Sequence, residues 1–300
     1  MSAASVRRWR TFAAPLARRM LGRLALVSAM NAVEAAHLRQ LCCSARFGAP
    51  CDLKTCAAVM GAAAVPTAAG AELARAVAAE WRAGRFVWLA ASTHAPEEVE
   101  CAAAHALLCA AAPRAPKPLL LLVPRQPERA ADIVAELALS HPTLRTAQYS
   151  AGGVAPMRHA DVFLVDALGL LAPLYAATGA AFVGNSLRAG GRGHNLAEAA
   201  AAGAAVLVGP HLGPFAEMAA QLRAAGGPDC VQAVADGAAL GAALAALRDT
   251  PDEAACRGRC AQNAARRLAG CALDALARDV SAALLLDAPA AGHRPWTDTS

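Results

Sequence analysis

Short apolar runs alternate with longer segments of helical periodicity from residue 86 onward. A run such as 119–123, LLLLV, is too short for a helix and ends at proline, which is typical of a buried strand. The segments between these runs repeat apolar residues at helical spacing. The pattern predicts strands at 86–91, 119–123, 143–149, 162–165, 180–183, 205–208 and 230–234, and helices at 97–111, from about 128, at 170–178, 195–202, 214–225 and 238–286.

This alternation predicts an α/β fold, with a parallel sheet covered by helices on both faces. Ligands of such sheets bind beyond the carboxyl ends of the strands, so polar residues that directly follow a strand are candidates for function. The N-terminal part of the chain is less regular. It predicts a basic helix at 6–21, a short strand at 24–29, helices at 32–41 and 71–83, and a linker at 48–66.

Alanine raises the hydrophobic fraction to 57%, whereas aromatic residues contribute only 4%. The core is therefore expected to consist mainly of small aliphatic side chains. The net charge of +5 is modest, and the sequence contains no nucleic-acid-binding motif with interleaved aromatic residues. These features favour a small anionic partner, such as a nucleotide or a lipid headgroup, and argue against nucleic acid.

Residues 1–30 are rich in arginine and alanine and contain no acidic residue. Three interpretations are open: an organellar transit peptide, a basic amphipathic helix at a membrane surface, or part of the folded protein. No apolar run is long enough, and free enough of charge, proline and glycine, to predict a membrane-spanning helix. The ten cysteines lack C-x-x-C spacing and stand mostly among alanines, which favours reduced thiols over a metal site or disulfides.

Residues 182–198, FVGNSLRAGGRGHNLAE, combine a strand end, a glycine-rich loop and a helix start. Glycines let the backbone approach a ligand, and a helix N-terminus attracts anions, so a phosphate site is predicted around Gly193, His194 and Asn195. His194 and Glu198 could contact a sugar. The alternative is a capping box between Asn195 and Glu198, which accounts for neither the cluster of glycines nor His194.

Two other strand ends carry polar candidates. Ser92, Thr93 and His94 follow the first predicted strand of the sheet, where a helix start would explain the hydroxyls but not the histidine. Pro124 and Arg125 follow the LLLLV strand. The guanidinium there could bind phosphate or carboxylate, or it could form a surface pair with a glutamate.

Asp166 and Gly169 follow a further predicted strand, where an Asx turn or a helix cap is the simpler interpretation. The sequence contains no nucleophile elbow, Walker A loop, zinc-protease motif or EF-hand loop. It also lacks a clear glycosidase-type pair of carboxylates. The residues therefore favour a metal-free site for an anionic ligand.

Six motifs follow one another between residues 92 and 217: STH-x-x-EE, PR-x-PER, D-x-x-G-x-L-x-x-LY, FVG-x-SL, GHN-x-x-E and GPH-x-x-x-F-x-E. Together they resemble the C-terminal domain of the 3-deoxy-D-manno-octulosonic acid (Kdo) transferases. The resemblance continues weakly into the N-terminal segment that begins SVRRWR. It also includes Asp52-Leu53-Lys54, which is similar to the inter-domain linker of that family.

This resemblance implies a GT-B-like glycosyltransferase fold, in which two Rossmann-like domains face each other. Residues 1–60 would be a remnant of the N-terminal Rossmann-like domain with its linker. Residues 61–286 would form the C-terminal nucleotide-sugar-binding domain with its parallel sheet, and 287–300 a loose tail. The arginines near the N-terminus would then be family residues, which counts against a transit peptide.

The resemblance also implies transfer of Kdo from CMP-Kdo to a lipid A precursor in lipopolysaccharide biosynthesis, with no cofactor and no metal. Arg125 and the loop 193–195 would hold the CMP phosphate and the Kdo carboxylate, and Glu198 would contact the ribose. Ser92, Thr93 and His94 would line the cleft, with Pro124 and Gly169 as further motif residues. The expected location is a peripheral membrane surface: the cytoplasmic side of the inner membrane in a bacterium, or a mitochondrion or other organelle in a eukaryote.

The chain departs from the family pattern at several positions. Most of the family's first domain, which holds its catalytic glutamate, is expected to be missing, so no residue here is assigned that role. Leu170 replaces a glutamate, Gln126 a histidine, Asn185 and Arg192 glycines, and Pro214 an asparagine. Whether the chain is an enzyme therefore stays open. The alternatives are a catalytically inactive CMP-binding or protein-interaction module derived from the family, and an unrelated sugar-nucleotide enzyme of similar fold.

Overall fold

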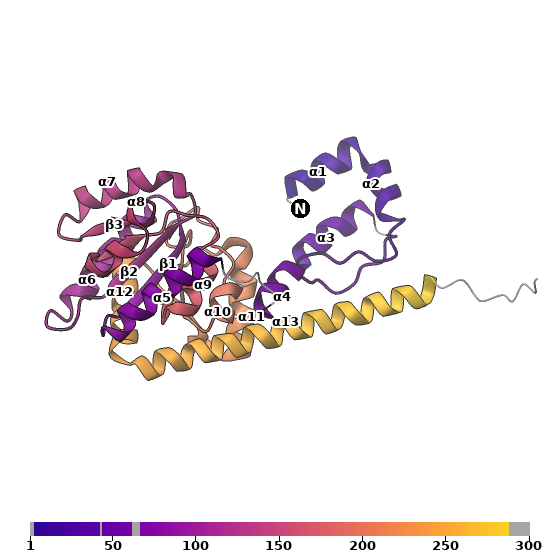
Figure 1. Ribbon diagram of the computed structural model, residues 1–300. Coiled ribbons are helices and arrows are strands. Elements are labelled where there is room, and N and C mark those ends of the chain that lie inside the picture. The colour runs from indigo at the N-terminus through magenta and orange to yellow at the C-terminus, as the bar shows by residue number, and fades with distance from the viewer. Residues whose placement is uncertain (1–2, 43, 62–66, 288–300) are drawn as a thin grey trace, which may run out of the picture. The chain divides into compact units, whose positions relative to one another are not determined.

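The structure is a computed structural model that describes residues 3–42, 44–61 and 67–287. The chain divides into two compact units, Met1–Ala57 with Ala269–Ser300, and Ala58–Leu268. The second unit contains the sheet (Figure 1). Apart from Asp287, the predicted tail at 287–300 lies outside the described residues.

Within the described residues, one sheet of seven parallel strands has the order β3-β4-β2-β1-β5-β6-β7. The predicted α/β fold with a parallel sheet is thus confirmed. The strands are β1 Val87–Thr93, β2 Leu119–Pro124, β3 Thr146–Gln148, β4 Val162–Leu164, β5 Ala180–Val183, β6 Ala205–Val208 and β7 Val231–Ala233. The edge strands β3 and β7 are partly exposed, whereas β2, β4, β5 and β6 are buried along their whole length.

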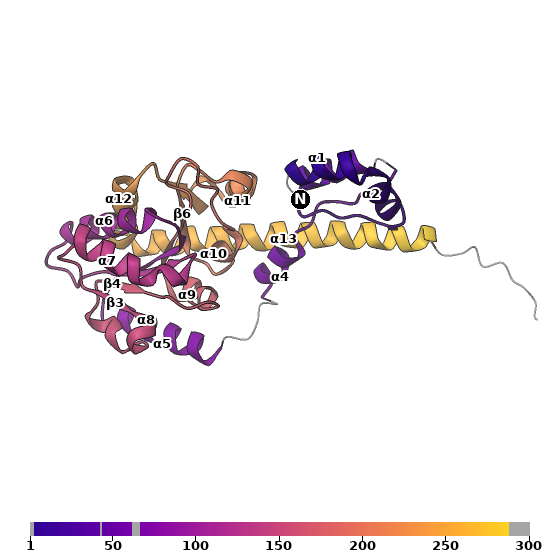
Figure 2. The same cartoon turned by 90° about the horizontal axis from the view of Figure 1, so that it is seen from above.

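Helices cover both faces of the sheet (Figure 2). The buried side chains of α6, α7 and α12 pack with alternate residues of the central strands in one core cluster. On the opposite face, α5 and α9 pack against each other and against β1. The helices of this unit are α5 Ala68–Arg82, α6 Glu97–Ala110, α7 Ala130–Ser140, α8 Tyr149–Gly152, α9 Leu171–Ala177, α10 Ala197–Ala201, α11 Ala216–Gly226, α12 Gly237–Asp249 and the first part of α13 Pro251–Asp287.

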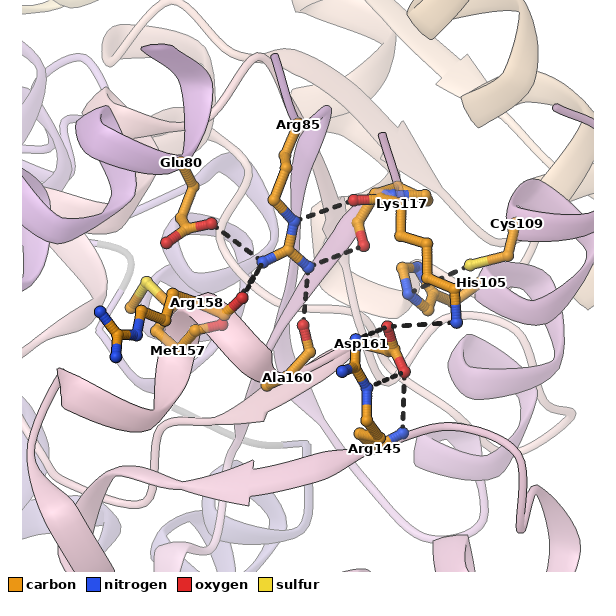
Figure 3. A network of polar contacts seen from close by, with 11 residues as sticks. Glu80, Arg85, His105, Cys109, Lys117, Arg145, Met157, Arg158, Ala160 and Asp161 are labelled. Carbon is orange, nitrogen blue, oxygen red and sulfur yellow. Dashed lines mark hydrogen bonds and ion pairs between the residues drawn. The ribbon is translucent and has the colours of Figure 1, made fainter. Parts of the chain in front are cut away.

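A buried arginine forms hydrogen bonds at the amino ends of neighbouring strands (Figure 3). Arg85 lies just before β1, is 9% exposed, and donates from Nη1 to Glu80 Oε2 at 2.9 Å. Its three nitrogens also donate to the backbone carbonyl oxygens of Lys117, Pro118, Met157, Arg158 and Ala160 at 2.6–3.4 Å. These carbonyls precede β2 and β4, so one side chain connects the starts of three neighbouring strands.

A second buried charge lies beside this arginine. The carboxylate of Asp161 accepts hydrogen bonds from the backbone N–H of Arg145 at 3.0 Å and from its guanidinium at 3.1 Å. Lys117 Nζ is 3.8 Å from the same carboxylate. Burial raises the pKa of Asp161, but the Arg145 hydrogen bonds and the two positive charges outweigh it, and the pKa falls below its usual value. This carboxylate therefore stays ionised in the folded chain.

A buried histidine makes stability depend on pH. His105 accepts a hydrogen bond at Nδ1 from Trp88 Nε1 at 3.1 Å, and its pKa is lowered to about 3, chiefly by burial. Because the unfolded chain takes up this proton first, stability is expected to fall by up to about 1.4 kcal/mol per pH unit as pH drops from about 6.5 towards 3.

The His105→Gln variant keeps an acceptor for Trp88 but cannot titrate, so it should flatten this part of the pH dependence. Urea denaturation of both proteins at several pH values measures the slope. His141→Gln, at the half-buried C-cap of α7, is the matched control. Equal slopes for wild type and His105→Gln would contradict the assignment.

The other unit consists of short helices and the last part of α13. Two core clusters form here, one around Val6, Ala17 and Leu41 and one around Val27, Cys42 and Ala45. This packing favours the interpretation that the basic N-terminal segment belongs to the folded protein. Its helices are α1 Ala3–Phe12, α2 Ala14–Leu21, α3 Ala32–Leu41 and α4 Leu53–Val59.

Three predictions for this unit are corrected. The single helix predicted at 6–21 is broken at Ala13, because Pro15 fits only the first turn of a helix. The strand predicted at 24–29 is one isolated bridge between Val27 and Phe47. The predicted linker at 48–66 contains α4, where Asp52 Oδ1 accepts from the Thr55 N–H at 3.2 Å, and its positions 62–66 lie outside the described residues.

None of the helices in the described ranges combines the length and the hydropathy needed to cross a lipid bilayer. The nine cysteines that the structure describes are all free thiols, and five of them are buried. Across the same residues, no group of three or more potential metal ligands comes together.

Candidate functional site

The strand order creates a switch point between β1 and β5. The chain runs from β1 to β2 on one side, and later returns to place β5 on the other side of β1. Loops leaving two such strands diverge at their carboxyl ends, which is where ligands bind in open α/β sheets. The segments that begin with Ser92 and with Gly184 leave the sheet at this point.

Two histidines from these segments meet. His94 Nε2 and His194 Nε2 are 3.1 Å apart, although the residues are 100 positions apart in the sequence. Their rings stack with centroids at 5.3 Å and an interplanar angle of 18°. Both side chains are half-buried. The sequence predicted both as site residues, and the structure brings them into direct contact.

Arg125 lies beside this pair. Its backbone N–H donates to Thr93 O at 2.9 Å, and Pro124 pairs with Thr93 across an irregularity at the end of β1. The exposed guanidinium acts on His194 electrostatically: burial, the neighbouring His94 and then Arg125 lower the pKa of His194 to about 4. His194 is therefore neutral at physiological pH in the free chain.

The end of β1 has an unusual backbone. Ser92 has φ of 55°, in the left-handed region that few non-glycine residues adopt. The adjacent Thr93 is 1% exposed, and its hydroxyl has no hydrogen-bond partner within the described residues. A buried hydroxyl without a partner is costly, so this atom is free to bond to a ligand or a water.

Glu97 anchors the loop after β5, a role that the sequence did not predict. Its Oε1 accepts from the N–H groups of Ser186 at 2.9 Å and Leu187 at 3.0 Å, and its Oε2 accepts from Asn185 N–H at 2.5 Å. Glu97 is 2% exposed. The sequence suggested only a first-turn acid of a helix, and its position between a histidine and a second glutamate was the sole hint of more.

The glycine before this loop is required for the close approach. A Cβ on Gly184 would lie 2.7 Å from Glu97 Oε2 and 2.8 Å from Thr93 Cα. The next residue, Asn185, has φ of 56°. Asparagine tolerates this conformation better than most residues, which accounts for its presence where the resemblance noted in the sequence implies glycine.

Ser186 joins the loops after β5 and β6, and it too was missed. It is fully buried, donates from Oγ to Val183 O at 2.7 Å, and accepts from Gly209 N–H at 2.9 Å. Its carbonyl oxygen accepts from His211 N–H at 2.9 Å. A Cβ on Gly209 would lie 2.1 Å from that carbonyl oxygen, so the close approach of the two backbone segments requires glycine at this position.

The glycine-rich loop before α10 is held by a backbone hydrogen bond between its two ends. Gly193 has φ of 62° and donates its N–H to Asn185 O at 2.6 Å. Asn195 Oδ1 accepts from Ala197 N–H at 2.9 Å. The helix itself, Ala197–Ala201, is shorter than the predicted 195–202. A five-residue helix makes a weak macrodipole, so Arg125 and the histidines become the main features of the candidate anion site.

Glu198 follows His194 in the first turn of α10, whereas Gly169 lies in the loop after β4. Glu198 is half-buried near Tyr175 of α9, whose pKa is raised by burial and then by the charge of Glu198. Gly169 follows β4, which β2 separates from β1, and has φ of 80°. Asp166 in the same loop accepts from Ser150 N–H at 3.0 Å and Gln148 Nε2 at 2.6 Å, which is a structural role.

The remaining departures from the Kdo transferase pattern fit their surroundings. Leu170 is 4% exposed and packs in the interior. Pro214 begins a 3-10 turn after Gly213, where proline is tolerated. Gln126 and Arg192 are exposed, so both substitutions are compatible with the fold.

Comparison with known proteins places these features in a family context. No protein-family model matches the chain. A 3-deoxy-D-manno-octulosonic acid transferase from Bordetella pertussis is 42% identical over 143 residues, which cover 48% of this chain and 33% of that protein. A probable mitochondrial 3-deoxy-D-manno-octulosonic acid transferase from Arabidopsis thaliana is 36% identical over 132 residues, 44% of this chain and 28% of that protein. The matched part thus spans about a third of these relatives.

Solved structures agree with the sequence comparison. The C-terminal CMP-Kdo binding domain of WaaA from Acinetobacter baumannii superposes with a TM-score of 0.54 and 25% identity, covering 70% of this chain and 98% of that domain. An α,α-trehalose-phosphate synthase from Burkholderia vietnamiensis, 14% identical, shares the glycosyltransferase fold with a TM-score of 0.51 over 94% of this chain and 66% of its own. The chain is therefore similar in sequence to about a third of the length of 3-deoxy-D-manno-octulosonic acid transferases, and its α/β unit is similar in fold to the C-terminal CMP-Kdo binding domain of WaaA.

Proposed function

We propose that the carboxyl edge of the sheet binds the nucleotide sugar CMP-Kdo. The observation that carries this proposal is the convergence of Arg125, His94 and His194 at the switch point between β1 and β5. A positive charge and two imidazoles in one place suit an anionic ligand. The relatives add the identity of the anion, because the related domain of WaaA is a CMP-Kdo binding domain.

Each predicted site residue has a role in this proposal. Arg125 and the backbone of the loop 193–195 hold the phosphate and the Kdo carboxylate. Glu198 accepts a hydrogen bond from a ribose hydroxyl. The unpaired hydroxyl of Thr93 bonds to the ligand beside His94. Ser92, Pro124 and Gly169 shape the backbone at the ends of β1, β2 and β4.

We further propose that this binding serves Kdo transfer to a lipid A precursor in lipopolysaccharide biosynthesis, at a peripheral membrane surface. In a bacterium that surface would be the cytoplasmic side of the inner membrane, and in a eukaryote it would belong to a mitochondrion or another organelle. The chemistry would be displacement at the anomeric carbon, in which Arg125 stabilises the departing CMP phosphate. No described residue is assigned as the catalytic base.

A second candidate function is CMP-Kdo binding without catalysis. Leu170 favours it, because a buried leucine stands where the family pattern has glutamate. Incubating the chain with CMP-Kdo and a lipid A precursor, followed by mass spectrometry, separates the two. A product heavier by one Kdo supports transfer, whereas binding without product supports the non-catalytic module. Transfer from a UDP-sugar in the control reaction would instead indicate a different donor class.

The Arg125→Ala variant tests the binding site. Because hydrogen bonds to charged groups contribute about 1.5–3 kcal/mol, the variant should bind CMP-Kdo about 10- to 150-fold more weakly in calorimetry. Arg114→Ala, an exposed arginine between α6 and β2, is the matched control and should bind like wild type. Equal affinities for Arg125→Ala and wild type, or the absence of heat at millimolar CMP-Kdo, would contradict the proposal.

A further inference from the structure

The histidine pair carries one proton between its two rings. A hydrogen bond between two imidazole nitrogens needs one N–H donor and one lone-pair acceptor, and His94 Nε2 and His194 Nε2 are 3.1 Å apart. If both nitrogens were protonated, two N–H groups would face each other and the pair would separate. The contact in the free chain therefore contains a single Nε2–H, and the other Nε2 accepts it.

The surroundings oppose a second proton. Arg125 lies next to the pair after β2, and the exposed Arg192 precedes it in the loop after β5. Two acids of α6 contact this loop: both oxygens of Glu97 accept from backbone N–H groups, and Glu100 is paired with Arg188. The pKa of His194 is lowered to about 4 by burial, by His94 and by Arg125. Protonation thus requires a negative charge from outside the chain.

An anionic ligand supplies that charge. A phosphate or carboxylate beside Arg125 offers several acceptor oxygens, and it favours the protonated form of any imidazole within a few ångströms. We propose that binding of CMP-Kdo takes up one proton from solvent at Nε2 of the accepting ring, which keeps its Nδ1–H and becomes an imidazolium, so that the His94–His194 contact opens and each ring donates its Nε2–H to the anion. This inference rests on the proposed function and adds to it the protonation state of the site.

The sign of the pH dependence follows directly. The second proton binds weakly to the free chain and more tightly to the complex, so affinity for the anion increases as pH falls. Between the two pKa values the affinity should rise by up to tenfold per pH unit, and it should level off outside that range. A site that used only Arg125 would show no such dependence, because arginine stays charged throughout.

Calorimetry measures the proton directly. CMP-Kdo is titrated into the full chain near neutral pH in several buffers, such as PIPES, MOPS and Bis-Tris, that differ in ionisation enthalpy. Its phosphodiester and carboxylate keep their charge in this range, whereas the phosphomonoester of CMP titrates near pH 6 and would add its own proton. The observed enthalpy should become more positive as the ionisation enthalpy of the buffer increases, with a slope approaching one proton per ligand.

Three variants locate the proton. His94→Asn and His194→Asn should both reduce the slope to near zero, since either change removes one member of the pair. His141→Asn, at the C-cap of α7 and outside the site, should leave the wild-type slope. Binding with zero slope in the wild type, or an unchanged slope in both pair variants, overturns the inference while leaving the proposed function intact. Absence of any CMP-Kdo heat overturns both.

Nuclear magnetic resonance tests the pair without ligand. Imidazole nitrogen shifts of the free chain, assigned with the same variants, should show one protonated Nε2 shared by His94 and His194. The protonation midpoint of His194 should lie near its lowered pKa of about 4. If His194 instead titrates at the usual histidine value of about 6.5, the shared proton is excluded.

Discussion

Replacement of Arg85 by methionine is expected to lower the free energy of unfolding by about 3–5 kcal/mol, because it leaves one partner of a buried ion pair uncompensated. The Glu80 carboxylate loses its 2.9 Å contact and remains only 8% exposed. The backbone carbonyls at the amino ends of β2 and β4 lose their donors at the same time. Methionine fills a similar volume, so the decrease in the free energy of unfolding reflects the lost polar contacts more than lost packing.

Urea denaturation followed by circular dichroism measures this loss. Arg82→Met is the matched control, because Arg82 is exposed at the end of α5 and its side chain donates to the Ala78 carbonyl of its own helix. The double variant Glu80→Gln/Arg85→Met should lose less stability than Arg85→Met, since no buried charge remains. If Arg85→Met is no less stable than Arg82→Met, the proposed importance of the network is wrong.

Replacement of Glu97 by glutamine should lower the free energy of unfolding by about 1.5–3 kcal/mol, the range for hydrogen bonds to charged groups. Glutamine keeps one oxygen for the N–H groups of Ser186 and Leu187. Its NH₂ group would face the N–H of Asn185, so two donors would meet. The loop should shift, and with it His194, so affinity for CMP-Kdo should fall as well.

The control for this substitution is Glu136→Gln on the exposed side of α7. Chemical denaturation and calorimetry with CMP-Kdo are compared for wild type and both variants. A normal unfolding midpoint for Glu97→Gln would show that the three N–H contacts contribute little. A normal midpoint with weakened binding would mean that Glu97 positions the loop without stabilising the fold.

The strands of the sheet were predictable because short apolar runs with clear ends mark them. β5 and β6 have the predicted bounds, since glycine follows each strand. β1 extends two residues beyond its prediction, to Thr93, because the polar end of this strand pairs with β2 across an irregularity. That pairing depends on a strand about thirty residues away, which local hydrophobic patterning does not record.

The candidate site was predictable only in its parts. Strand-end positions indicated His94, Arg125 and His194 individually, but nothing in the spacing indicated that the two histidine rings touch. Glu97 has an ordinary local role as a first-turn acid, and its contacts to residues 185–187 connect positions nearly ninety residues apart. Such contacts form because β1 and β5 are neighbours in the sheet, and the sequence alone did not predict that strand order.

The two polar networks lie at opposite ends of the strands, one at the amino ends and one at the carboxyl ends, and they share no residue. Arg85, Glu80 and Asp161 hold the amino ends of the strands, whereas Glu97 and Ser186 hold the loops at the carboxyl ends. Effects of substitutions in two such separate groups add almost independently. Residues near the carboxyl ends of the strands can therefore be substituted, as Leu170 and Arg192 illustrate, while the network at the amino ends is kept. The same separation means that the loops at the proposed sugar-nucleotide site could be redesigned without changing the polar network at the amino ends of the strands.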